Sequence, residues 1–593
     1  MTDARRGVLV GLAAAGLALG ALAGAGLPAF YESFLYLVFS WIALATSWSI
    51  LSGYAGYFSF GHGAFFGAGI YTTATLAGAL GVPFLWTLCA CGALAGLLGA
   101  GIGAVVFRVK RLRGELFGLL TLAITFVLAT IVLNTRIDGG PGVYLSAVPM
   151  PGLVRSPTGT LYLLGLGLAV VTVALAYVVA HSRLGLGLYA IHDDEDVAEV
   201  KGVPTFAYKL CAFALSASVA GVAGGIHAMY VSYVTVSETF SITVPLYVVL
   251  MSVLGGARHW LGPAVGATLI TASLYAFTGG AQAVLGRAVV ALALIVVILI
   301  LPEGVVPAVI ARARAWRGRS PAAPPVASAQ DAAPAPAGRA KAVAAPAAAP
   351  GTPADLDCRN VWKSFGGIQA LSGVSLAVGA GEIVGLVGPN GSGKTTLINV
   401  ISGHYAADRG QIALGGVTLT DRAAHEIAGL GVSRTYQIPR PFAHFTALDD
   451  VALAAAFGAA RSTPREARAE ARRWLAFTGL SHRAATLPHE LNLHERKFLE
   501  LARALAARPR VILLDEVLSG LNPGEVASAI QLIRRIQASG VTIVFVEHLM
   551  RAVLELSDRV VVLNEGEVIA MGSPREVMRD PRVVRVYLGD NAA

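Results

Sequence analysis

Residues 383–397 read IVGLVGPNGSGKTTL. The first five residues are apolar and predict a buried strand, the glycine-rich middle predicts a loop, and the run that begins at Thr396 (TLINVISG) predicts a helix. The loop matches GxxxxGK[ST] in the strand–loop–helix setting that this motif requires. Its glycines let backbone N–H groups converge on phosphate oxygens, and the helix N-terminus adds its positive end. This stretch therefore predicts an α/β domain that binds the phosphates of a nucleotide.

The side chains of this loop indicate how such a nucleotide is held. Lys394 is placed to reach the β- and γ-phosphates, and the Thr395 hydroxyl is placed to bind Mg²⁺. We expect nucleotide contacts from Gly388, Asn390, Gly391, Ser392, Gly393, Lys394, Thr395 and Thr396.

Two later strands end in polar side chains. Residues 511–516, VILLDE, are an apolar run with two carboxylates at its end, and the apolar run 541–546 comes just before His548. The carboxyl ends of parallel strands are where an α/β sheet binds its ligands. Asp515 therefore suits Mg²⁺ binding, and Glu516 suits polarising a water for attack on the γ-phosphorus. A lone histidine is usually a surface or core residue, but at this edge we expect His548 to contact the γ-phosphate.

The first half of the chain has a different composition. The 593 residues are 55% hydrophobic and 14% charged, whereas an average soluble domain has about 25% charged residues. Residues 1–319 hold 17 Lys/Arg and 11 Asp/Glu, so the apolar excess belongs there. Segments of about 20 apolar residues are long enough to cross a bilayer. We predict a polytopic α-helical membrane domain of about ten spans, at 7–27, 34–53, 58–80, 84–107, 115–133, 160–181, 208–231, 240–257, 262–279 and 284–301.

The distribution of basic residues tests this count, because cytoplasmic loops carry an excess of Lys and Arg. With the N-terminus inside, the clusters of basic residues at Arg5–Arg6, 108–113, 182–207 and 312–319 fall on the cytoplasmic side. Two alternatives stay open. Segment 58–80 is glycine-rich and could be re-entrant, and residues 1–26 have features of a cleaved signal peptide. We prefer a retained first span, because its loss would leave an odd number of crossings.

Residues 320–355 are almost entirely Ala, Pro, Gly and Ser. Such a composition buries too little apolar surface to offset the entropy of ordering, so we predict a flexible linker at 320–356. It separates a membrane domain, 1–319, from a nucleotide-binding domain, 357–593. The net charge of +9 does not indicate nucleic-acid binding, because the basic residues of the first half cluster beside apolar runs and no basic stripe is interleaved with aromatic residues.

Further motifs make the second half resemble the ATPases of ABC transporters, and closely those of the branched-chain amino acid uptake family. Besides the phosphate loop and VILLDE, they are Phe365 in VWKSFGGIQAL, Gln437 in SRTYQ, SGLNP (519–523) and VEHLM (546–550). The resemblance covers residues 357–593. It implies that ATP and Mg²⁺ are the cofactors, that Phe365 stacks on adenine, that Gln437 contacts the nucleotide and the metal, and that the α/β domain carries a helical subdomain.

The family's signature motif is altered in this chain. Its ATPases act as dimers, in which each ATP lies between one chain's phosphate loop and the other's signature. Here the signature is Leu491 to Glu495, LNLHE, so that Asn492, His494 and Glu495 are the expected nucleotide contacts. Asn492 stands where Ser is usual and His494 where Gly is usual. A side chain in place of Gly should crowd the phosphate, so beside a partner with an ordinary signature the two ATP sites would be unequal.

The first half also resembles that family's permeases, over most of residues 34–301. The segments that carry the resemblance are 51–72, 111–123, 182–225 and 254–267. Within the third, the charged stretch from His192 to Lys201 interrupts apolar sequence on the cytoplasmic side. A plain solvated loop would have the same composition, but the resemblance implies a coupling helix that docks into the ATPase near Gln437.

The resemblance implies the permease and ATPase half of an importer, which takes a small polar solute, a branched-chain amino acid first, across the cytoplasmic (inner) membrane. The N-terminus and the ATPase domain then lie in the cytoplasm. The expected partners are a second permease and a second ATPase subunit, or a second copy of this chain, and an extracytoplasmic solute-binding protein. Import of urea or a short amide, an ATP-gated regulator or channel that does not pump, and an exporter stay open. The set of Asp515, Glu516 and His548 argues against a regulator, and the import-type permease segments argue against an exporter.

Overall fold

The computed structural model describes residues 3–24, 26–109, 112–138, 142–154, 156–277, 292, 295–297, 299–316 and 356–588. The chain divides into two compact units. The first consists of residues 1–192 and 206–328, and the second of residues 193–205 and 329–593. Residues 193–205 therefore make their contacts with the second unit, although the sequence on both sides of them belongs to the first. The predicted linker at 320–356 lies outside the described residues except for Leu356.

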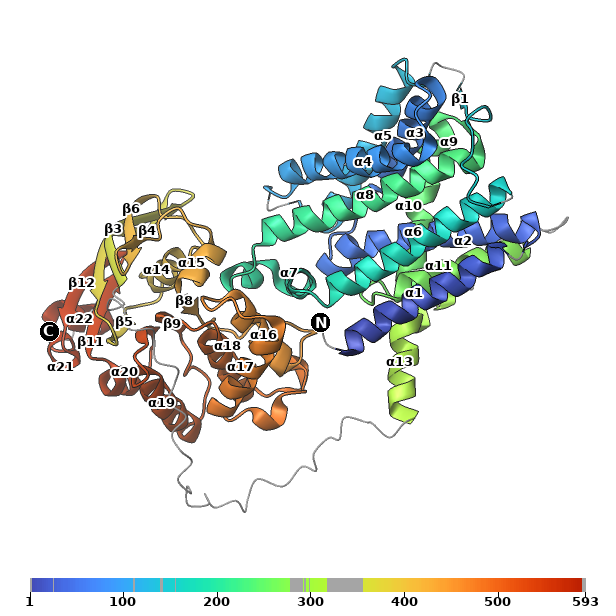
Figure 1. Cartoon of the computed structure of the whole chain (residues 1–593). Coiled ribbons are helices and arrows are strands. Elements are labelled where there is room, and N and C mark those ends of the chain that lie inside the picture. Colours follow the sequence, from blue (N-terminus) through green and yellow to red (C-terminus); the bar gives the residue numbers. More distant parts are fainter. Residues whose placement is uncertain are drawn as a thin grey trace. The chain divides into compact units, whose positions relative to one another are not determined.

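The first unit is a bundle of helices (Figure 1). Where they are described, they are α1 (Asp3–Gly24), α2 (Ala29–Trp48), η1 (Ser49–Gly53), α3 (His62–Thr73), η2 (Ala74–Ala79), α4 (Phe84–Val106), α5 (Glu115–Leu133), α6 (Pro157–Ala180), α7 (Arg183–Val200), α8 (Thr205–Val231), α9 (Val236–Thr239), α10 (Thr243–Gly255), α11 (Gly262–Phe277) and α13 (Val305–Trp316). Two short strands, β1 (Val143–Tyr144) and β2 (Tyr233–Val234), pair antiparallel.

Small residues bring neighbouring helices of this bundle close together. Gly96 and Gly99 of α4 face Ser218 and Ala217 of α8, and a Cβ added at either glycine would clash with the facing side chain. Without water to drive apolar surfaces together, membrane helices gain their contact from such close packing. The apolar composition of these segments therefore fits a helix bundle in lipid.

The predicted membrane domain is confirmed in kind. Six helices of the described residues are long and apolar enough to cross a membrane: 29–55, 84–106, 115–133, 157–180, 205–231 and 236–255. In segment 58–80 the helix begins only at His62 and ends in the π-helix η2. The predicted span 262–279 is helical to Phe277, and most of the predicted span 284–301 lies outside the described residues. The count of ten therefore stays a prediction.

Contacts within the first unit agree with the predicted sides of its loops. The Ser156 hydroxyl donates to the Glu32 carboxylate over 2.9 Å, and Val143 pairs with Val234 in the β1–β2 sheet. All four residues lie on the outer side if the basic residues mark the inner one. The first helix is part of the bundle, because the Tyr162 hydroxyl of α6 donates to the Leu19 carbonyl of α1 over 2.7 Å.

The second unit contains two sheets (Figure 1). One has six strands in the order β12-β11-β5-β10-β9-β8, all parallel except β12, and the other has four antiparallel strands in the order β4-β3-β6-β7. The strands are β3 (Leu356–Phe365), β4 (Ile368–Val378), β5 (Ile383–Val387), β6 (Arg409–Leu414), β7 (Val417–Thr418), β8 (Val432–Arg434), β9 (Val511–Asp515), β10 (Thr542–Val546), β11 (Arg559–Asn564) and β12 (Glu567–Gly572). β5, β9 and β10 are buried along their whole length, as parallel strands covered on both faces should be.

Helices cover the sheets and add a helical subdomain, α16 to α18, as the sequence predicts. They are α14 (Lys394–Ile401), α15 (Ala424–Leu430), α16 (Ala447–Phe457), α17 (Pro464–Phe477), α18 (Leu493–Ala506), α19 (Pro523–Gln537), α20 (Met550–Leu556), α21 (Pro574–Val577) and α22 (Pro581–Leu588), with short turns η3 (Ser481–Arg483) and η4 (Pro488–Glu490). The core between the sheets is aliphatic and includes Leu386, Leu513 and Val544. It fixes the strand ends that carry the candidate site.

Candidate functional site

Four strand ends of the six-stranded sheet meet at one edge. β10 lies between β5 and β9, and β8 lies beyond β9. Because these strands are parallel, their carboxyl ends share an edge of the sheet. The phosphate loop follows β5, Glu516 follows β9, His548 comes just after β10, and Gln437 comes just after β8. The topology thus gathers the predicted residues from four separate parts of the chain.

The phosphate loop has the backbone that its glycines predict. Gly388 and Gly393 have φ values of +150° and +101°, and an added Cβ at either position would clash with a backbone carbonyl. α14 begins at Lys394, so its N-terminus opens onto the loop. The Lys394 ammonium donates to the carbonyls of Gly388 (2.8 Å) and Pro389 (2.7 Å), and burial lowers its pKa. The ammonium therefore lies where phosphate oxygens would be its neighbours.

The other predicted residues of the loop differ in exposure. Asn390, Gly391 and Thr395 are exposed, Thr396 is half-buried and Ser392 is buried. The exposed side chains form the open rim of the loop, which a nucleotide can reach.

Phe365, predicted to stack on adenine, is the last residue of β3 and is 41% exposed. The Tyr405 ring lies against it at an angle of 70°, with 5.0 Å between the ring centroids. The Lys363 ammonium lies 5.3 Å from the Phe365 centroid. The two rings offer exposed aromatic surface of the kind on which a base stacks. Tyr405 was not predicted, because it follows α14 in a stretch without a motif.

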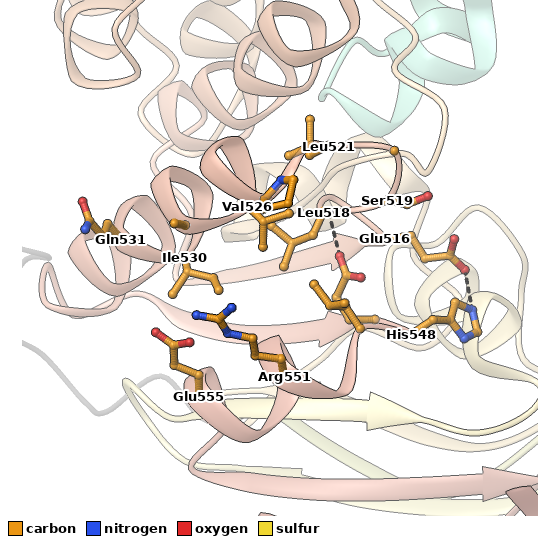
Figure 2. Close-up of a pocket in the computed structure, with 15 residues that line it drawn as sticks. Glu516, Leu518, Ser519, Leu521, Val526, Ile530, Gln531, His548, Arg551 and Glu555 are labelled. Carbon is orange, nitrogen blue, oxygen red and sulfur yellow. Dashed lines mark hydrogen bonds and ion pairs between the residues drawn. The ribbon is translucent and has the colours of Figure 1, made fainter. Parts of the chain in front are cut away.

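Glu516 lies between two polar side chains from neighbouring strand ends. Gln437 Nε2 donates to Glu516 Oε2 over 2.6 Å, and His548 Nε2 lies 2.9 Å from Glu516 Oε1. Figure 2 shows the side chains of Glu516 and His548 facing each other. Glu516 has a φ of +47°, which non-glycine residues rarely adopt. Its N–H donates to the Val546 carbonyl over 3.0 Å. A strained backbone held in this way is typical of functional positions.

Asp515 fits the magnesium role in its chemistry. The side chain is 2% exposed, and Oδ2 lies 3.9 Å from Arg434 Nη2. Oδ1 is buried and has no hydrogen-bond partner in the described part of the chain. Burial raises the pKa of Asp515, and Arg434 opposes that rise. An unpaired buried carboxylate oxygen suits a hard cation or a water bound to it. Thr395 and Gln437, the other predicted metal ligands, are exposed.

The altered signature forms the start of α18. Asn492 is the N-cap: its Oδ1 accepts from the Glu495 N–H over 2.8 Å, and Glu495 Oε2 accepts from the Asn492 N–H over 3.0 Å. The carboxylate of Glu495 also accepts from Arg483 over 2.8 Å. The His494 ring packs on Phe498, with 4.2 Å between the ring centroids. The ring is thus held toward the second turn of the helix. In this position it points along α18, and the predicted crowding of the partner's phosphate would require the ring to leave Phe498.

Residues 193–205 dock beside the stretch that carries Gln437. α7 bends at Asp194, whose φ and ψ are −158° and 104°, so a separate short helix follows it. The Asp193 carboxylate accepts from the His444 N–H over 3.0 Å and lies 2.7 Å from His444 Nδ1. Arg440 lies 3.7 Å from Asp194. The predicted docking of the charged stretch near Gln437 agrees with these contacts.

A groove of about 590 Å³ begins at Glu516 and His548. Figure 2 shows its walls, which come from α19 and α20. Glu547 also lines the groove, is 4% exposed, and accepts from the Leu518 N–H over 2.7 Å. Burial raises the pKa of Glu547 to about 7. The groove adjoins the edge of the sheet that carries the predicted site residues, but no residue of the phosphate loop lines it.

The sequence did not reveal the polar contacts inside the first unit. His62 Nε2 lies 3.2 Å from the Ser47 hydroxyl and 3.4 Å from the Ser216 hydroxyl. The Tyr36 hydroxyl lies 3.3 Å from His227 Nδ1. These side chains come from three helices, α2, α3 and α8, so their spacing along the chain carries no signal.

Family models match both halves of the chain. The family described as "Branched-chain amino acid transport system / permease component" matches residues 30–301, and "ABC transporter" matches residues 371–519. "Branched-chain amino acid ATP-binding cassette transporter" matches residues 567–593. A LivG protein of Archaeoglobus fulgidus, a probable branched-chain amino acid transport ATP-binding protein, is 35% identical over 244 residues, which cover 40% of this chain and 95% of that protein. The chain belongs to the branched-chain amino acid ABC transporter family.

Other relatives match the same part of this family member. BraF of Pseudomonas aeruginosa, a high-affinity branched-chain amino acid transport ATP-binding protein, is 35% identical over 249 residues, 40% of this chain and 98% of that protein. The lipopolysaccharide export ATP-binding protein LptB of Acidithiobacillus ferridurans is 37% identical over 235 residues, 40% of this chain and 97% of that protein. A nucleotide-free ATP-binding cassette of known structure is 31% identical, with 40% of this chain and 100% of that chain covered and a TM-score of 0.37. The chain thus joins the permease and the ATP-binding components of an ABC transporter, and its ATP hydrolysis is coupled to transport.

Proposed function

We propose that this chain is the permease and ATPase half of an importer that carries branched-chain amino acids across the cytoplasmic membrane. The observation that carries the proposal is the permease match over residues 30–301, on the same chain as the ABC transporter match over residues 371–519. The ATPase likeness alone would not suffice, because LptB, an export protein, is as similar in that part as the LivG protein is. The N-terminus and the ATPase lie in the cytoplasm in this proposal, which the basic residues of the cytoplasmic loops support.

The roles of the site residues follow from their chemistry. Lys394 and the N-terminus of α14 bind the phosphates, and Phe365 stacks on adenine. Glu516 polarises the attacking water, with Gln437 and His548 orienting its carboxylate. Mg²⁺, held by the Thr395 hydroxyl, Gln437 and Asp515, offsets the negative charge of the phosphate oxygens when bound.

The assembly needs a second ATPase, because an ABC-type site is completed by the signature of another chain. Asn492, His494 and Glu495 serve the partner's nucleotide in this arrangement. A second permease and an extracytoplasmic solute-binding protein complete the proposed importer. Residues 193–205, through Asp193 and His444, transmit motion between the permease spans and the ATPase.

The test is uptake of radiolabelled leucine by cells that lack their other leucine importers and express this chain with its partner subunits. Wild-type protein should support uptake, and Glu516→Gln should abolish it at equal membrane levels. Valine and isoleucine should compete, whereas urea and acetamide should not. Uptake of urea with no uptake of leucine would replace the proposed substrate, and export of leucine would reverse the proposed direction.

A further inference from the structure

Lys201 is a buried cation in the segment 193–205. It is 2% exposed, although the sequence around it is that of a charged cytoplasmic loop. Its ammonium donates to the Arg434 carbonyl over 2.9 Å and to Glu500 Oε2 over 3.5 Å. Burial lowers its pKa to about 8, so that the buried ammonium depends on these partners for its charge. A solvated connection would not bury a lysine in this way.

The first partner, Arg434, ends β8 and belongs to the ATP site. Its guanidinium donates to Asn399 and to the Ser402 hydroxyl (3.2 Å) at the end of α14, the helix that starts at the phosphate loop. On its other side it lies 3.9 Å from the Asp515 carboxylate. The next residue, Thr435, accepts from the Asp515 N–H over 3.1 Å. The backbone that Lys201 holds therefore fixes the surroundings of the candidate magnesium carboxylate.

The second partner, Glu500, belongs to α18, which starts at the altered signature. Glu500 also accepts from Arg503 (2.6 Å) and from the Arg440 N–H (3.1 Å), and Arg503 lies 2.8 Å from Asp450. All these side chains except Arg440 are at most 2% exposed. Charges buried this deeply tolerate little displacement, because losing one partner leaves another uncompensated. The cluster therefore ties Lys201 rigidly to the signature helix.

The backbone next to Lys201 fits closely against the helical subdomain. Gly202 has a φ of +98°, and a Cβ added there would clash with the Phe457 carbonyl at the end of α16. Val200 and Val203 are also buried. The close fit of the neighbouring residues thus fixes how deeply the Lys201 side chain enters the ATPase unit.

We propose that Lys201 is a positioning residue for ATP hydrolysis, which sets Asp515 through Arg434 and the signature helix through Glu500. One ammonium from a segment of the permease sequence thereby acts on the ATP site of its own chain and on the motif that completes the partner's site. Asp193 docks the same segment through a different residue, His444. Variants of Asp193 and of Lys201 therefore test docking and positioning separately.

The experiment compares Lys201→Met with Asp193→Asn in the full chain, purified with its partner subunits in lipid. Lys201→Met keeps an apolar stem of similar length and removes the ammonium, with its charge and its N–H donors. It should lower kcat for ATP hydrolysis about tenfold or more, because small displacements of a catalytic geometry are costly, and it should leave KM for ATP within about twofold. Asp193→Asn should lower solute uptake per ATP and leave kcat within about twofold.

Two further variants keep the proposal open to refutation. Lys201→Arg, which keeps a charged donor, should recover part of kcat, and Lys201→Gln, which keeps only a neutral donor, serves if the methionine variant does not assemble. A normal kcat in Lys201→Met or Lys201→Gln, with uptake alone reduced, would make Lys201 a docking contact and overturn the proposal. The proposal rests on the proposed function only through ATP hydrolysis, so a different solute would leave it intact.

Discussion

The Nε2 atom of His548 lies 2.9 Å from Oε1 of Glu516. His548 follows β10 and Glu516 follows β9, and these strands pair in parallel with Val546 beside Asp515. The register of two strands thus sets the distance between an imidazole and a carboxylate that are 32 residues apart in the chain. In the proposed mechanism Glu516 is the general base, which must be oriented before it can act on a water, and His548 orients it from the neighbouring strand.

Glu516→Gln should keep ATP binding and lower turnover about a hundredfold or more, because a general base contributes roughly that factor. The measurement is phosphate release by the assembled transporter beside binding of a fluorescent ATP analogue. Turnover within twofold of wild type would remove Glu516 from the proposed role. Lys394→Ala is the matched comparison, since it should weaken nucleotide binding itself by removing the ammonium from the phosphate loop.

His494→Gly tests whether the altered signature limits the partner's site. The ring packs on Phe498 at 4.2 Å between centroids, so we expect turnover to stay equal or to rise. Glycine is a poorer helix former than histidine by only about 0.4 kcal/mol, so a melting curve should show a small loss of stability.

The inequality of the two ATP sites is measured with a partner ATPase of ordinary signature. Glu516→Gln alone should then reduce hydrolysis much more than the equivalent change in the partner. Equal losses would show that both sites turn over alike, and the altered signature would then be functional.

Charge reversal at Asp193 should uncouple uptake from hydrolysis. Asp193→Lys places a cation beside the His444 N–H and ring, where the carboxylate now accepts, so the contact with His444 should be lost, whereas the buried contacts of Lys201 keep the rest of the segment in place. We expect uptake to fall about tenfold or more, since a buried charge without a partner costs several kcal/mol. Unchanged uptake at equal protein level would reduce the segment to a solvated connection.

Glu547→Gln should change the pH dependence of stability. Burial raises the pKa of Glu547 to about 7, so the folded chain holds this proton where the unfolded chain has lost it. The stabilisation is complete below the ordinary glutamate pKa of about 4.5 and is lost as the pH rises through 7. The neutral amide keeps an acceptor for the Leu518 N–H and removes this loss.

Thermal unfolding of the purified chain at pH 5.5 and pH 8 measures the effect. Relative to wild type, Glu547→Gln should gain about 2 kcal/mol between the lower and the higher pH, since one pKa unit corresponds to about 1.4 kcal/mol. Glu555→Gln, on the exposed rim of the same groove, is the control. A difference between wild type and Glu547→Gln that does not vary with pH would contradict the assignment.

The sequence by itself determined the features that depend on local pattern. The phosphate loop at 388–395 is fixed by glycine and lysine spacing, and the strands 383–387, 511–515 and 542–546 by short apolar runs. The membrane helices were predicted in kind, because about 20 apolar residues have few other stable conformations. The exact number of membrane spans could not be predicted, since a glycine-rich helix such as α3 has the same composition whether or not it crosses the whole bilayer.

Only the tertiary structure decided which distant side chains meet. Lys201 ends the charged stretch that the sequence singled out, but nothing in the sequence showed that its ammonium lies 2.9 Å from the Arg434 carbonyl. Tyr405 contacts Phe365 because the chain after α14 returns beside β3, where the Asp408 N–H donates to the Trp362 carbonyl. The direction of the His494 ring depends on Phe498 and not on the motif. Spacing along the chain reports backbone periodicity, whereas contacts between residues far apart depend on strand register and packing, which the whole fold sets at once.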